Sequence, residues 1–311
     1  MHGRELWKSD GTAEGTVLLA DTYPLLADSG PNSLTRVGQL LFLTTPKQVW
    51  RSDGTQAGTF PVFSPPGNGG WGAATGSLGS AFFFVHHTSA SGLELWRSDG
   101  TPEGTGLFKD LNPGPGGSMG SAPMVQVGNS LFFNASDGIH GQELWKSDGT
   151  PEGTQRVADI APGLAAGISP SYNTTGAPLR VIGDAVYFAA DDGVHGMELW
   201  KSDGTAEGTT LLRELTPGAA GSALQSLSIV PAGPHGTFAF AASSAAGGLE
   251  LWRSDGTTEG TWPLYATAPG TPVSSPSLLT VSGSRLFFVA DDGEHGRELW
   301  SVKQAAFNQR P

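Results

Sequence analysis

The sequence contains no cysteine, few charged residues and no long run of apolar residues. Without cysteine the chain has no disulfide bonds, no thiolate metal ligands and no cysteine nucleophile. No apolar stretch approaches the roughly 18 residues that a membrane-spanning helix needs, so membrane insertion is not expected. The 29 acidic residues outnumber the 17 Lys and Arg, which gives a net charge of −12. A surface of that sign disfavours nucleic acid and anionic membranes as partners.

Glycine and proline are abundant where charge is scarce. The 311 residues include 46 Gly and 22 Pro, while only 15% are charged, against roughly 25% in a typical globular protein. Long helices are disfavoured because glycine and proline interrupt every helical period. With 38% apolar residues the chain can still form a core. This composition predicts an all-β fold built from many short strands and tight turns.

One twelve-residue stretch repeats along the whole chain. It reads ELWKSDGTAEGT from Glu5 to Thr16, and its tryptophan marks seven copies, the last of them truncated. Successive tryptophans lie 43 to 55 residues apart. A period of this length is typical of the four-stranded blades of a β-propeller. The repeat tryptophans are Trp7, Trp50, Trp96, Trp145, Trp200, Trp252 and Trp300.

Each repeat is predicted to form four short strands, a to d. In the last copy Ser277–Val281, Leu286–Ala290 and Glu298–Trp300 fit strands a, b and c, and Val17–Ala20 fits strand d in the first copy. Counting such segments predicts one propeller domain over residues 1–311. It has six blades, and the N-terminal strand d closes the ring on the C-terminal a, b and c. Seven blades, one of them incomplete, are the alternative.

The repeat resembles the ELWxxDGTxxGT family of exported bacterial proteins, and the resemblance covers nearly all of the chain. It implies an extracellular or cell-surface protein, with the outer membrane or periplasm as alternatives, and it implies no activity. The order of the strands also resembles propellers of pyrroloquinoline-quinone dehydrogenases, in architecture only. Residues Met1–Arg4 lack a signal-peptide pattern, and the chain begins in mid-repeat. We therefore expect a fragment of a longer repeat protein.

Two repeated features are interpreted as structural. The tryptophans are expected to pack between neighbouring blades, with a ring of sugar-stacking platforms as the alternative. The aspartate of each Ser-Asp-Gly-Thr turn is expected to accept N–H groups of its own turn. The alternative is a divalent cation such as calcium, held with the following glutamate, although calcium needs six to eight oxygens; no cofactor is predicted. The turn aspartates are Asp10, Asp53, Asp99, Asp148, Asp203 and Asp255.

Two charged positions flank each tryptophan. A basic residue such as Lys8 follows it, and a glutamate such as Glu94 comes two residues before it in nearly every copy. The two side chains leave a strand on opposite faces because their spacing is odd. We therefore expect them to meet across the gap between blades as ion pairs.

The ligand-binding candidates lie outside the repeated turn. Three loops read Asp-Gly-x-His-Gly, and histidine can ligate metals or transfer protons. A local Asp–His hydrogen bond that closes the turn is the alternative. Trp71 lies in a glycine-rich segment that is expected to be a loop with an exposed aromatic side chain. These loops fall on the face formed by the b–c and d–a connections. The candidates are Trp71, Asp137, His140, Asp192, His195, Asp292 and His295.

The sequence carries no His-Glu-x-x-His motif and no P-loop, and no catalytic residue is assigned. The favoured hypothesis is a non-enzymatic scaffold that binds protein or glycan at the cell surface. One alternative is a carbohydrate-active hydrolase or lyase with its site on the b–c and d–a loops. The other is a structural subunit of a surface assembly. The metal and the oligomeric state are left open.

Overall fold

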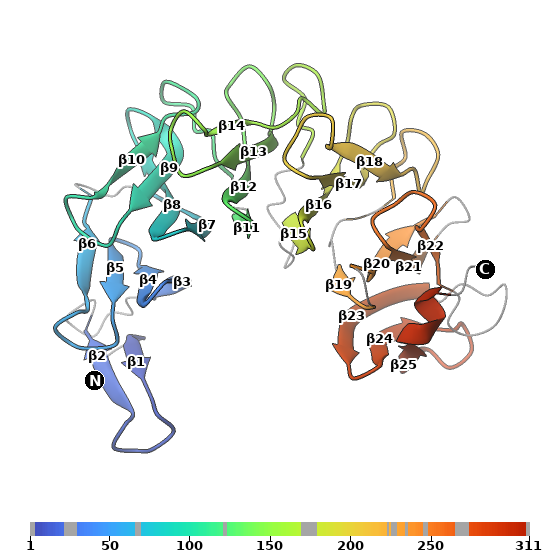
Figure 1. Ribbon diagram of the computed structural model, residues 1–311, viewed down its shortest axis with the longest axis horizontal. Coiled ribbons are helices and arrows are strands. Elements are labelled where there is room, and N and C mark those ends of the chain that lie inside the picture. Colours follow the sequence, from blue (N-terminus) through green and yellow to red (C-terminus); the bar gives the residue numbers. More distant parts are fainter. Residues whose placement is uncertain are drawn as a thin grey trace. The chain divides into compact units, whose positions relative to one another are not determined.

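The computed structural model describes residues 4–21, 30–65, 70–120, 123–168, 179–222, 224, 229–233, 236–244, 248–264 and 274–308. The chain forms two compact units. Unit 1 comprises Met1–Ile139 and Trp145–Gln155, and unit 2 comprises His140–Leu144 and Arg156–Pro311. Both units are built from small antiparallel sheets (Figure 1). Within the described residues, no helix has the length and apolar character required to cross a membrane.

Unit 1 begins with a two-stranded sheet, which two four-stranded sheets follow. Each four-stranded sheet keeps its strands in chain order, from strand a on one edge to strand d on the other. The strands are β1 (Leu6–Lys8) and β2 (Val17–Ala20), then β3 (Asn32–Val37), β4 (Leu40–Thr44), β5 (Val49–Ser52) and β6 (Phe60–Phe63), then β7 (Trp71–Leu78), β8 (Ala81–Thr88), β9 (Gly92–Ser98) and β10 (Thr105–Lys109).

A further four-stranded sheet follows, and the two units divide within it. Its last strand has only two residues. The strands are β11 (Val125–Val127), β12 (Ser130–Ala135), β13 (Glu143–Ser147) and β14 (Gln155–Arg156).

Unit 2 contains two more four-stranded sheets and a three-stranded sheet. A short 3-10 helix, η1 (Gln304–Asn308), follows the last strand and buries Phe307. The strands are β15 (Leu179–Ile182), β16 (Ala185–Ala190), β17 (Glu198–Ser202) and β18 (Thr210–Arg213), then β19 (Val230–Pro231), β20 (Phe238–Ser243), β21 (Leu249–Ser254) and β22 (Trp262–Pro263), then β23 (Ser274–Ser282), β24 (Arg285–Asp291) and β25 (Arg297–Lys303).

The four-stranded repeat predicted from the sequence is confirmed. In each of the five four-stranded sheets, strands a, b, c and d form one antiparallel meander, so the fold is all-β and propeller-like. The predicted strand Val17–Ala20 is β2, which pairs with β1. The sequence also predicts that β2 lies beside the C-terminal strands, which belong to the other unit. That closure of the ring stays a prediction, and so does the choice between six and seven blades.

The apolar cores lie between consecutive sheets of each unit. In unit 1, Phe83 and Leu95 of one sheet cluster with Phe133 and Trp145 of the next. Strand b supplies most of the aromatic side chains because it is an inner strand, covered on both faces. In unit 2 an equivalent cluster contains Tyr187, Leu199, Leu212, Phe238, Phe240 and Trp252. Burial of these large side chains is the main source of stability for such sheets.

Candidate functional site

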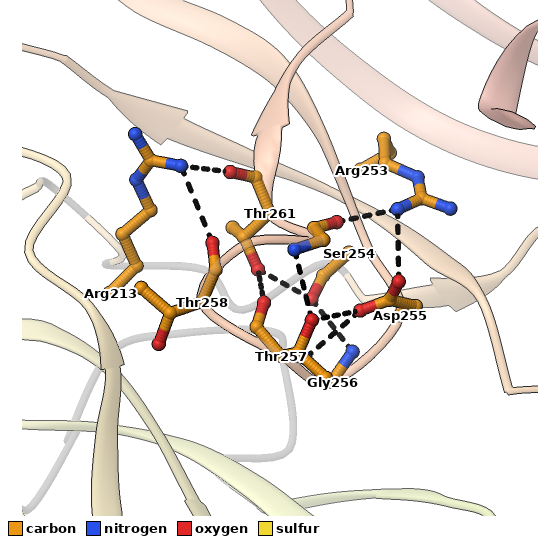
Figure 2. A network of polar contacts seen from close by, with 9 residues as sticks. Arg213, Arg253, Ser254, Asp255, Gly256, Thr257, Thr258 and Thr261 are labelled. Carbon is orange, nitrogen blue, oxygen red and sulfur yellow. Dashed lines mark hydrogen bonds and ion pairs between the residues drawn. The ribbon is translucent and has the colours of Figure 1, made fainter. Parts of the chain in front are cut away.

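The Ser-Asp-Gly-Thr turn is closed by hydrogen bonds among its own residues (Figure 2). In the copy at Asp255, the backbone N–H and the hydroxyl of Thr257 both donate to Asp255 Oδ1, at 3.0 and 2.7 Å. The N–H of Gly256 donates to Ser254 Oγ at 2.9 Å, and that oxygen also pairs with Thr261 Oγ1 at 2.7 Å. The Asp255 carboxylate thus stabilises the turn that contains it by accepting hydrogen bonds from Thr257.

All six copies make the same bonds. The threonine N–H donates to the aspartate Oδ1 at 2.8–3.0 Å, and the serine and distal threonine hydroxyls lie 2.6–2.7 Å apart. The threonine side-chain bond is the main cause that lowers the pKa of Asp10, Asp53, Asp99 and Asp148. These carboxylates therefore act as acceptors that stay ionised at neutral pH.

The second glycine of each motif lies directly against the aspartate. A Cβ placed on Gly153 would lie 2.1 Å from Asp148 Oδ1, far inside contact distance. Gly153→Ala should therefore expel the carboxylate from its turn and lower the free energy of unfolding by about 2–3 kcal/mol. Urea titration measures the change. Gly106→Ala is the control, because a Cβ on Gly106 would meet no atom within 4 Å. Equal stability of the two variants would contradict this account.

The basic residue after the tryptophan links one sheet to the next. In three copies it donates to the carbonyl of the glycine in the following Ser-Asp-Gly-Thr turn. The bonds run from Lys8 to Gly54 at 2.7 Å, from Arg51 to Gly100 at 3.2 Å, and from Lys201 to Gly256 at 2.7 Å.

The glutamate before the tryptophan anchors the connection between strand d and the next sheet. Glu94 is fully buried and accepts bonds from the N–H groups of Leu111 and Ser118, at 2.8 and 3.1 Å, and from Ser118 Oγ at 2.6 Å. Burial raises the pKa of Glu94, although these bonds oppose the shift. Glu143 and Glu198 are equally buried and hold backbone N–H groups in the same way.

The predicted ion pairs are therefore wrong for these residues. Glu94, Glu143 and Glu198 bind backbone amides, whereas the basic side chains bind carbonyls. The physical reason is that both positions are next to unpaired backbone groups, which need partners wherever they are buried.

Most of the repeat tryptophans lie in the apolar seams between sheets. Trp50, Trp145 and Trp252 are buried, and Trp252 Nε1 donates to the carbonyl of Ala242 at 3.2 Å. Trp96, Trp200 and Trp300 are half-buried. Trp7, on the first strand, is 51% exposed. A sugar-stacking platform needs a free ring face, which the three buried tryptophans do not offer.

Two of the three Asp-Gly-x-His-Gly loops bring their Asp and His side chains together. His195 Nδ1 lies 2.7 Å from Asp192 Oδ2, and His295 Nδ1 lies 2.8 Å from Asp292 Oδ2. The other carboxylate oxygen accepts the backbone N–H of the same histidine, at 2.9 and 2.8 Å. The bond to the aspartate raises the pKa of both histidines. Each pair closes its turn and leaves Nε2 as the ring nitrogen available to a ligand.

These pairs predict a pH dependence. We expect His295 to titrate above its ordinary value of 6.5, and Asp292→Asn to bring the pKa back towards 6.5. The aspartate contribution to loop stability is present above pH 3.8 and lost as pH falls through its lowered folded pKa. The histidine contribution is present below pH 6.5 and lost as pH rises through its raised folded pKa. NMR titration of the histidine Cε1–H checks this, and a pKa unchanged by Asp292→Asn would refute the pairing.

The remaining candidates are placed only in part. Asp137 Oδ1 accepts the N–H of Ile139 at 3.0 Å, at the turn before His140. Trp71 is not in a loop, contrary to the prediction, but opens β7 and pairs with His86. The eight-residue strand β8 supplies a partner for the glycine-rich segment, and Gly72 fits because a Cβ there would lie 2.6 Å from Val85. The Trp71 side chain lies outside the described structure.

The alternative interpretation of the turn aspartates is a calcium site, and the described residues contain no cluster of acidic or histidine side chains that would form one. Within those residues, no group of three or more His, Asp or Glu side chains converges as a metal site would require. The Oδ1 atom of each turn aspartate accepts hydrogen bonds from the threonine of the same turn, as Asp10 Oδ1 does from Thr12.

One surface feature was not predicted from the sequence. A hollow of about 560 Å³ lies between β10 and the following Ser-Asp-Gly-Thr turn, and its lining includes Arg97, Glu103, Gly106, Leu107 and Glu152. The sequence signal for it is Gly106, which stands where two other copies carry an aromatic residue, Phe60 and Trp262.

No family model and no curated protein matches the chain. Among solved structures, it is similar to Porphyromonas gingivalis dipeptidyl peptidase 4, with a TM-score of 0.60 at 7% identity, over 94% of this chain and 46% of that one. A puromycin-hydrolyzing peptidase of Mycobacterium tuberculosis matches at a TM-score of 0.48 and 12% identity, over 89% and 44%. BamB of Moraxella catarrhalis matches at 0.42 and 15%, over 92% and 73%. The chain spans less than half of either peptidase, and at these identities the likeness concerns the fold alone.

Proposed function

We propose that the chain is part of an exported bacterial propeller that binds protein or glycan at the cell surface through its b–c and d–a loops. The observation that carries the proposal is the way these loops are fixed. Buried glutamates such as Glu94 tie the d–a connections to the sheets, and Asp–His pairs such as Asp192 and His195 close the b–c loops. A rigid frame that presents variable loops is a common basis for recognition.

Two further points support this assignment. The side chain of His295 is 72% exposed while its Nδ1 is held by Asp292, so the ring is both accessible and oriented. The resemblance of the ELWxxDGTxxGT repeat to exported bacterial proteins supports an extracellular or cell-surface location, with the outer membrane or periplasm as alternatives.

The function can be tested with a glycan array and a displayed peptide library, each probed with the purified chain. Binding should occur, and the double variant His195→Ala with His295→Ala should weaken it at least tenfold. The matched control is Glu207→Gln with Glu259→Gln, which changes the turns at the other ends of the strands. Binding that survives the histidine variant but is lost in the glutamate variant would place recognition on the opposite face. Cleavage of an arrayed glycan would instead support the hydrolase or lyase alternative.

Ring closure is part of the same proposal. The residue after the tryptophan pairs with the residue that follows the distal Gly-Thr, as Lys201 pairs with Thr210. In the structure Val17 pairs with Lys8 of β1; if β2 completes the C-terminal sheet with β25 in place of β1, the same register puts Val17 opposite Ser301. We expect Val17→Cys with Ser301→Cys to form an intramolecular disulfide on oxidation, in a chain that has no other cysteine. Two free thiols in the folded, oxidised variant would favour seven blades.

A further inference from the structure

In two repeats an aromatic ring covers the basic residue that follows the tryptophan. Phe60 pairs with Arg51 across β5 and β6, and the guanidinium carbon lies 4.7 Å from the ring centroid. Trp262 pairs with Arg253 across β21 and β22 in the same register, at 4.0 Å. Both are cation–π contacts, in which the flat guanidinium lies over a ring face. The strand d residue opposite the basic residue is thus a ring position in these copies.

The repeat of β9 and β10 lacks this ring. Arg97 pairs with Gly106, and a Cβ on Gly106 would have no neighbour within 4 Å. Within the described structure, the buried Nε of Arg97 has no hydrogen-bond partner, and the same holds for Arg51 Nε, so the missing ring is the difference between the two repeats. The 560 Å³ hollow lies at this point and is lined by both residues. The space that a ring fills in the repeats of Phe60 and Trp262 is therefore open here, and no strand d side chain lies over the guanidinium of Arg97.

The backbone beside the hollow is also open. β10 is the outermost strand of its sheet, and it is the longest of the six strands d in the described structure. Pro61 and Pro263 occupy the position of Leu107 in the two repeats that carry the ring, and proline cannot donate a hydrogen bond from a strand edge. Leu107 retains its N–H and is 46% exposed. An edge of this kind can accept an additional strand.

We propose that β10 and the adjoining hollow bind an extended protein segment that pairs with the β10 edge and inserts an aromatic side chain over Arg97. The inserted ring takes the place that Phe60 and Trp262 occupy in their own repeats. Glu103 and Glu152 line the same hollow, so basic residues on either side of the aromatic one match its charge. This site is separate from the b–c and d–a loops and does not depend on the function proposed for them.

A blocked synthetic peptide, KVWVTK, and its twin KVAVTK provide the test. We expect the tryptophan peptide to shift the NMR amide signals of Gly106 and Leu107, and the alanine twin to bind at least tenfold more weakly. Gly106→Trp fills the hollow from within the chain and should weaken binding of KVWVTK at least tenfold. Gly106→Ala is the matched control and should bind like the wild type. Both variants should keep the wild-type melting temperature to within a few degrees, because Trp262 occupies the equivalent position.

Leu107→Pro is a second, independent variant, which removes the edge N–H as Pro61 and Pro263 do in their strands. It should also weaken binding of KVWVTK. The proposal is overturned if KVWVTK fails to bind at millimolar concentration, if the alanine twin binds equally well, or if Gly106→Trp binds like Gly106→Ala. A wild-type dimer in sedimentation that Gly106→Trp dissociates would overturn the choice of occupant, because a second copy of this chain would then fill the hollow.

Discussion

Replacing Trp252 with alanine is expected to lower the free energy of unfolding by about 3–5 kcal/mol, the usual cost of deleting a large buried aromatic side chain. Trp252 is only 4% exposed and packs in the seam with Phe240, Leu199 and Leu212. The deletion leaves a cavity between two sheets that cannot close without moving both. It also removes the donor to the Ala242 carbonyl.

Trp7→Ala is the matched control, because Trp7 occupies the same position of the repeat but is 51% exposed. Its loss should cost about 1 kcal/mol or less. Chemical denaturation followed by circular dichroism measures both variants without depending on indole fluorescence. A Trp252→Ala protein with unchanged stability and lost glycan binding would instead show that the repeat tryptophans are binding platforms.

Glu94→Ala is expected to lower the free energy of unfolding by about 2–4 kcal/mol. The variant leaves the buried N–H of Leu111 without its acceptor and removes the 2.6 Å bond from the Ser118 hydroxyl, and a buried group without a partner costs about 1–3 kcal/mol. The N–H of Ser118 keeps the carbonyl of Leu93 at 2.9 Å. The raised pKa of Glu94 offsets part of this, because burying the charged carboxylate is itself unfavourable. Glu103→Ala removes an exposed carboxylate nine residues later and should change stability by no more than about 0.5 kcal/mol.

The pH dependence of this difference has a definite sign. The folded state of the wild type binds a proton on Glu94 more tightly than the unfolded chain, whose ordinary pKa is 4.5. The stability of the wild type relative to Glu94→Ala should therefore rise as pH falls through the raised folded pKa, and become constant below 4.5. Unfolding titrations at a series of pH values measure it. A difference that shrinks as the solution becomes more acidic would show that hydrogen bonding, not burial, dominates this carboxylate.

The strands and turns could be predicted from the sequence because their determinants are local. The Asp255 turn is specified by residues no more than seven positions apart, and strand b is recognisable from aromatic runs such as Leu286–Ala290. Repetition then extends each local pattern over the whole chain.

The role of the glutamates could not be predicted in the same way. The partners of Glu94 are backbone N–H groups 17 and 24 residues further on, and backbone groups leave no pattern in a sequence. The hollow at Gly106 was missed for a related reason. A glycine in a strand suggests only a weak strand, and its meaning appears once Phe60 and Trp262 are seen over their arginines.

The bonds that close the Ser-Asp-Gly-Thr turn join Ser254, Asp255 and the residues up to Thr261, and the other copies make the same bonds. A genetic exchange between two repeats at this point would join unlike sheets through a turn that still closes. Such an exchange would move a blade of 43 to 55 residues while the bonds inside the turn stay the same. The bond from the preceding basic residue to the turn glycine would also be kept, because its acceptor is a backbone carbonyl.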